Sequence, residues 1–196
     1  MAQQYETAQV LPADVRARVS GELVCYARTV IHQEWPRMES GSAGETLNPW
    51  AVSLFRSLRT TDPQSASEQA AYSKWLDQTS DREEARRDRI HGAANVIPDS
   101  LWVVLIVSAG LIFLFMLFFA DRAEGAVTQA MLMGSVVSVV VVTLLVIRAL
   151  DNPYRAGLGQ LQSAAMERTL VVLEEEQRVT GETGELPCDD EGQESS

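Results

Sequence analysis

Two long apolar segments dominate the pattern of hydrophobic and polar positions along the chain. Residues 101–120 contain no charged side chain, and Gln129 is the only strongly polar side chain within 126–147. A helix needs roughly 20 apolar residues to cross a hydrocarbon core of about 30 Å, and both segments reach that length. Their apolar residues occupy every face, whereas a surface helix of a soluble protein keeps one face polar. The pattern therefore predicts a transmembrane hairpin at 98–150, with spans at about 98–120 and 126–148.

The polar half that precedes the hairpin carries helical patterns. Apolar residues recur at intervals of three or four positions between about residues 12 and 34: Val15, Val19, Leu23, Tyr26 and Val30. Pro36 is expected to end this helix, because proline disfavours helical geometry in the residue before it. Asn48-Pro49 and Asp62-Pro63 are typical of helix starts, and the second of these helices is expected to run to about Asn95. Residues 12–97 are therefore expected to form a helical region outside the membrane.

A last amphipathic helix is expected within 151–178, and no segment has an alternation that favours a β-strand. The predicted fold class is all-α: a two-span transmembrane hairpin with a helical domain on one side of the membrane.

The two ends of the chain are polar. Residues 1–11 have neither the basic nor the apolar part of a cleavable signal peptide, and we expect a flexible N-terminus there. The chain carries a net charge of -11. Most of it lies after Leu173, and residues 179–196 are acidic and poor in apolar side chains. Such a segment cannot offset the entropy of ordering, so the sequence predicts a disordered acidic tail and no nucleic-acid partner.

The only cysteines are Cys25 and Cys188, which lie far apart and in different kinds of segment. Neither a disulfide framework nor a metal cluster follows from them. The usual serine, cysteine, zinc and phosphate-loop motifs of enzymes are absent. His32 beside Glu34, and His91 among arginines, have no second partner at a fixed spacing for acid–base work. No enzyme activity, catalytic residue, metal site or cofactor is therefore predicted.

Arginine placement predicts the orientation. Several arginines flank the hairpin: Arg82, Arg86, Arg87 and Arg89 before it, and Arg148, Arg155 and Arg168 after it. The turn between the spans carries only Arg122. The positive-inside rule then places both termini, the helical region 12–97 and the helix within 151–178 in the cytoplasm of a multi-pass plasma- or inner-membrane protein. Trp102, Tyr154, Arg148 and Arg155 are the expected anchors at the membrane interface.

Small residues recur every four positions on the second span: Ala126, Ala130, Gly134 and Ser138. Such a ladder lets two helices approach closely. Packing against the first span is the favoured interpretation, and a seam between subunits is the alternative.

Polar side chains on the second span are the candidates for lining a pore: Thr128, Gln129, Ser135 and Ser138. Hydroxyl donors without carboxylates suit anions better than cations. The alternative is that these hydroxyls bond their own backbone, as is common in membrane helices. Gln129 lies near the outer end of its span, where an interfacial role or an interhelical hydrogen bond is an equal alternative.

Five short motifs resemble a known family. They are Tyr26-Ala27-Arg28, Glu34-Trp35-Pro36, Arg86-Arg87-Asp88-Arg89-Ile90, Ile97-Pro98-Asp99-Ser100-Leu101-Trp102 and Leu150-Asp151-Asn152-Pro153-Tyr154. Their order and spacing, over roughly 10–173, resemble the bestrophin-like family of integral membrane proteins. The resemblance implies undefined activity and a distant kinship to anion channels. Members usually carry two further hydrophobic helices ahead of this region, so the chain is expected to be a shortened member or a truncated reading frame.

Two functions are consistent with these patterns. The first is a channel-like homo-oligomer in the lipid bilayer that conducts anions, favoured by the resemblance, Gln129 and the small-residue ladder. The alternative is a membrane-anchored interaction or scaffold protein without transport activity, favoured by the lack of charge within the spans.

Overall fold

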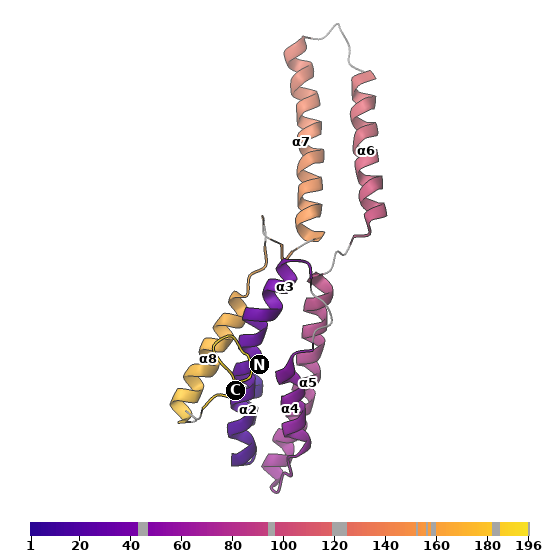
Figure 1. Cartoon of the computed structure of the whole chain (residues 1–196). Coiled ribbons are helices and arrows are strands. Elements are labelled where there is room, and N and C mark those ends of the chain that lie inside the picture. The colour runs from indigo at the N-terminus through magenta and orange to yellow at the C-terminus, as the bar shows by residue number, and fades with distance from the viewer. Residues whose placement is uncertain are drawn as a thin grey trace. The chain divides into compact units, whose positions relative to one another are not determined.

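The computed structural model describes residues 1–42, 47–93, 97–118, 125–151, 153–155, 157, 160–181 and 185–195. Over these residues the chain is helical, which confirms the all-α fold class (Figure 1). The elements are α1 (Ala2–Ala8), α2 (Ala13–Thr29), the π-helical turn η1 (Val30–Glu34), α3 (Trp35–Glu39), α4 (Pro49–Arg59), α5 (Ala66–Ala93), α6 (Asp99–Phe118), α7 (Ala126–Asp151) and α8 (Ala164–Thr180).

The chain divides into two compact units. The first comprises Met1–Ala93 together with Leu161–Ser196, and the second comprises Ala94–Gln160. The predicted boundary between a polar helical region and an apolar hairpin falls close to this division.

Helix α2 is the centre of the first unit. It contacts α1, α4 and α8, and Figure 1 shows it between α8 and α4. Val19, Leu23 and Val24 of α2 are completely buried, as is Trp75 of α5. Burying each such side chain contributes about 1.5–3 kcal/mol, so these contacts hold the unit together.

The N-terminus is not flexible, contrary to the expectation for residues 1–11. Helix α1 packs on α2 and α5, with Tyr5 and Ala8 almost completely buried. The buried side chain of Gln4 donates to Thr79 Oγ1 at 3.3 Å and accepts from Arg82. The sequence did not reveal this helix, because polar side chains such as Gln4 are buried with hydrogen-bond partners and so interrupt the apolar spacing of a packed helix.

Pro36 does not end the first long helix. The chain continues from α2 through η1 into α3, and Pro36 lies in the first turn of α3. Proline lacks the N–H of a regular helix and clashes with the carbonyl four residues earlier. The wider π-helical turn directly before it accommodates that mismatch.

The C-terminal region also differs from expectation. The predicted helix within 151–178 is α8, which begins at Ala164, whereas α7 extends to Asp151. Residues 185–195 are not disordered: they lie against α2, and Cys188 pairs with Glu194 in an isolated antiparallel bridge. The rest of the predicted tail is partly α8 and partly outside the described residues.

The second unit contains two helices with the length and composition of membrane spans. They are Asp99–Phe118, with 20 residues, and Val127–Asp151, with 25 residues, and their most apolar windows are 0% buried. A core helix of a soluble protein would be covered, so the exposed apolar faces favour a lipid environment. The predicted turn lies outside the described residues, Arg122 included, except for Gly125.

Candidate functional site

Glu34 is the centre of a buried ionic cluster in the first unit. Its Oε1 accepts from Arg86 Nε at 3.1 Å, and its Oε2 accepts from Arg89 Nη2 at 2.9 Å. The Glu34 side chain is 9% exposed, and the two arginine side chains are 12% and 15% exposed. Residues three positions apart share a helix face, so α5 directs both guanidinium groups at one carboxylate. The cluster joins η1 to α5.

Asn48 extends this cluster to α4. Its Nδ2 donates to Glu34 Oε1 at 3.2 Å, while its Oδ1 accepts from the backbone N–H of Trp50 at 3.0 Å. The second bond is the helix cap that the Asn48-Pro49 pattern predicts. One amide group therefore both starts α4 and holds it against Glu34.

A second cationic contact lies beside a small pocket. The guanidinium of Arg82 lies 5.1 Å from the centre of the Tyr26 ring, and its side chain is 5% exposed. Burial raises the pKa of the Tyr26 hydroxyl, Glu34 adds to this rise, and Arg82 opposes it. The adjoining open pocket, of about 220 Å³, is lined by polar groups that include Gln4, Arg82 and Arg89.

Glu22 is a buried carboxylate, and no cationic side chain among the described residues lies within ion-pair distance of it. Its Oε1 accepts from Ser53 at 2.6 Å and from Ser57 at 3.0 Å, both on α4. Burial raises the pKa of Glu22. The two serine hydroxyls, Arg18 and Arg56 lower this pKa, but by less than burial raises it. The group ties α2 to α4.

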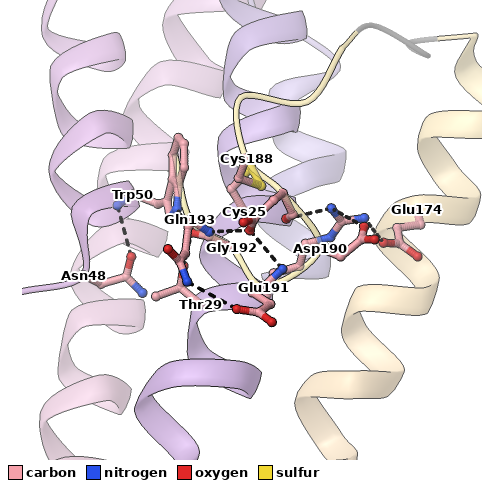
Figure 2. Close-up of a disulfide and its surroundings, with 12 residues drawn as sticks. Cys25, Thr29, Asn48, Trp50, Glu174, Cys188, Asp190, Glu191, Gly192 and Gln193 are labelled. Atoms are coloured by element: carbon pink, nitrogen blue, oxygen red, sulfur yellow. Dashed lines mark hydrogen bonds and ion pairs between the residues drawn. A yellow bond between two sulfur atoms is a disulfide. The ribbon is translucent and has the colours of Figure 1, made fainter. Parts of the chain in front are cut away.

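A disulfide joins Cys25 of α2 to Cys188, across a sequence separation of 163 and a Cα–Cα distance of 5.8 Å. Figure 2 shows the segment that carries Cys188 crossing α2. Thr29 Oγ1 and the indole Nε1 of Trp50 both donate to the carbonyl of Gly192, each at 2.8 Å. The sequence spacing gave no reason to pair these cysteines, because packing of α8 on α2 is what brings the ends together.

Asp151 closes the base of the hairpin in the second unit. Its Oδ1 accepts from the backbone N–H of Ile97 at 2.7 Å, and its Oδ2 accepts from Trp102 Nε1 at 3.1 Å. A carboxylate at the start of α6 also suits the positive end of that helix dipole. The end of α7 is thereby held to the start of α6.

The small-residue ladder is open in the single chain. Ala130, Gly134 and Ser138 are exposed, and a Cβ added at Gly134 would meet no atom within 4 Å. The side of α7 that faces α6 instead carries larger residues, such as Val136 and Val140, which line an apolar groove of about 190 Å³. The side chain of Ala126 is outside the described residues.

Three of the predicted pore-lining residues lie on the exposed surface of α7: Thr128, Ser135 and Ser138. Gln129 is half-buried. Ser135 donates to the carbonyl of Leu132 at 2.8 Å, and Ser138 donates to that of Gly134 at 2.7 Å. These are the backbone bonds of the alternative interpretation. A hydroxyl has one proton, so neither group can donate to an anion while it holds this bond.

The predicted interface anchors fall into two groups. Trp102 is half-buried and bonded to Asp151, and Tyr154 is buried, whereas Arg148 and Arg155 are exposed. Their contact with lipid headgroups stays a prediction.

The contacts of Glu34 and Asp151 were missed, although both residues lie in the motifs that carried the family resemblance. Glu34, in the second motif, pairs with Arg86 and Arg89 of the third. Asp151, in the fifth motif, accepts hydrogen bonds from Ile97 and Trp102 of the fourth. Among the residues that the structure describes, no three histidine, cysteine or acidic side chains are grouped to hold a metal ion.

Searches of curated proteins and of solved structures find no match. A family model for the Bestrophin-like domain matches residues 1–165, a stretch that contains the Glu34 cluster, the two apolar helices and the Asp151 contact. The chain therefore belongs to the Bestrophin-like domain family, as its motifs predicted.

Proposed function

We propose that this protein is a subunit of a channel-like homo-oligomer in the membrane, with an anion path formed between subunits. The observation that carries the proposal is the open ladder on α7, where Gly134 has space for another helix. The family is associated with channels rather than enzymes, which supports the same class of function.

Several subunits are required because two spans cannot enclose a pore. In a ring, α7 is the better lining, since it carries Thr128, Gln129 and Ser135. No charged side chain occurs in the described residues 101–118 and 126–147, so selectivity would come from these neutral polar groups. The Ser135 hydroxyl would have to leave its backbone bond to donate to an anion. The arginine distribution supports an orientation with both termini in the cytoplasm.

The assembly is tested first, by native mass spectrometry of the full chain in lipid nanodiscs. Gly134→Leu fills the space on the ladder and should shift the population toward monomers. Val139→Leu is the matched control, because residue 139 is exposed and lies about 140° away around the helix. Equal oligomer populations for the two variants would contradict a seam at the ladder.

Conduction is tested separately, with purified protein in liposomes under a chloride gradient. Wild-type protein should release chloride faster than empty liposomes. Ser135→Leu should reduce that flux without dissociating the oligomer, because residue 135 is exposed and lies about 100° from Gly134 around the helix, off the ladder. Flux equal to that of empty liposomes, from an intact oligomer, would refute the channel.

The second candidate is a membrane-anchored interaction protein. The specific observation in its favour is that Ser135, Ser138 and Thr143 all donate to their own helix backbone. Absence of flux together with an assembled oligomer would favour this function.

A further inference from the structure

The docked C-terminal segment 185–195 has an unusual composition for an ordered part of a protein. Five of its residues are acidic: Glu185, Asp189, Asp190, Glu191 and Glu194. Only Cys188 and Gly192 are buried, and Leu186 is half-buried. A segment that buries so little apolar surface does not offset the entropy of ordering by itself.

The polar contacts of the segment are mostly at the surface. Arg28 Nη1 lies 3.3 Å from Asp190 Oδ1, whose side chain is fully exposed, and also donates to the carbonyl of Asp189 at 3.0 Å. The Arg28 side chain is largely covered, but an ion pair whose acidic partner is fully exposed to solvent adds little stability. The two buried bonds converge on one carbonyl, that of Gly192, from Thr29 and Trp50 (Figure 2).

We propose that Cys25 and Cys188 form a redox-controlled clasp, which docks residues 185–195 on α2 and α4 when oxidised and releases them when reduced. The inference does not depend on whether the spans conduct ions. It joins two facts that otherwise conflict: the composition favours disorder, and the segment is ordered where a covalent bond holds it.

The chemistry is thiol–disulfide exchange with a low-molecular-weight disulfide. The thiolate of Cys188, on the released segment, attacks one sulfur of the small disulfide and expels one small thiol. The thiolate of Cys25 then attacks the mixed disulfide at Cys188 and expels the second thiol. One small disulfide is reduced to two thiols while two protein thiols are oxidised to the protein disulfide.

Access to the bond depends on the docked segment. Cys25 is 0% exposed and Cys188 is 5% exposed, so a reducing thiol reaches them only when the segment opens. A segment with two buried residues opens locally at low cost, without unfolding of the helices. In a cytoplasmic unit, where disulfides are usually transient and redox-sensing, the docked state would report oxidising conditions.

Glycine at position 192 is required for docking. Its φ is +78°, and an added Cβ would collide with the backbone N and the Oγ1 of Thr29. Gly192→Ala therefore blocks docking while both thiols remain, whereas Gln193→Ala is a control because the Gln193 side chain is exposed.

The test is hydrogen exchange of the full chain in detergent micelles, with alkylation to count free thiols. After oxidation by glutathione disulfide, residues 189–195 should be protected. After mild treatment with dithiothreitol, their exchange should rise on the order of 10-fold or more while α5 stays unchanged. Cys25→Ser should resemble the reduced protein under both conditions. Gly192→Ala should exchange fast and form the disulfide more slowly than Gln193→Ala.

Three results would overturn the clasp. The first is unchanged protection when both thiols are alkylated. The second is a disulfide that resists reduction until the whole unit unfolds, since the bond would then be a permanent cross-link. The third is a protein that stays reduced in glutathione disulfide.

Discussion

Replacing Glu34 with glutamine tests whether the buried ionic cluster holds the soluble unit together. Glu34→Gln keeps the size of the side chain and one carbonyl oxygen, but it leaves Arg86 and Arg89 without their shared counter-charge. The side chains of these two arginines are largely buried, with exposed fractions of 12% and 15%. The substitution therefore removes one partner from a largely buried arrangement.

The expected loss is about 3 kcal/mol in the free energy of unfolding, near the lower end of the range for breaking a buried pair, because some water reaches the arginines. Glu175→Gln is the matched control. Glu175 and Arg178 are only 2.7 Å apart, yet their side chains are 54% and 71% exposed. That change should cost less than about 0.5 kcal/mol, since exposed pairs are solvated and screened.

Urea titration of the full chain in detergent, followed by circular dichroism, measures both losses. The difference between the variants should persist in about 1 M salt, because salt screens buried pairs weakly. Equal losses for the two variants, or a loss for Glu34→Gln that disappears in salt, would refute the assignment of stability to burial of the cluster.

Two further predictions concern the buried carboxylates Glu22 and Asp151, and a third concerns the orientation in the membrane. The raised pKa of Glu22 means that the native state holds its proton more tightly than the unfolded state, so stability should fall as pH rises from the ordinary glutamate pKa to the raised one. Glu22→Gln should remove this fall in pH-dependent urea titrations; an unchanged slope would contradict it. Asp151→Ala should lower the free energy of unfolding by about 1–3 kcal/mol, because two donors lose their acceptor, whereas Trp102→Phe should lower it less. Thermal unfolding in detergent compares the two variants. A larger loss for Trp102→Phe would contradict the role of Asp151 in holding α7 to α6. In a background without native cysteines, Ala123→Cys should react with an impermeant thiol reagent on intact cells and Ser80→Cys should not; the opposite labelling would reverse the proposed orientation.

The Gly134 and Gly192 substitutions address different parts of the molecule. Loss of the oligomer in Gly134→Leu would leave the clasp intact, since it lies in the other unit. Failure of the clasp would leave the channel proposal unchanged. The two proposals can therefore fail independently.

Local patterns were sufficient to predict most of the longer helices and the family, but not α1. The expected long helix after Asp62-Pro63 is α5, Ala66–Ala93, and the Asn48 cap is present. The two apolar helices were also predicted, because length and composition are properties of neighbouring residues. Such signals need no knowledge of which faces later meet.

Contacts between distant segments required the tertiary structure. The sequence patterns used Arg86 and Arg89 only to predict the orientation and the family, because nothing local indicated that Glu34 would lie against them. The C-terminal segment read as disordered, because composition does not show that Cys188 reaches Cys25. Packing decides these pairings, because α8 on α2 brings together two cysteines from opposite ends of the chain, where a disulfide joins them.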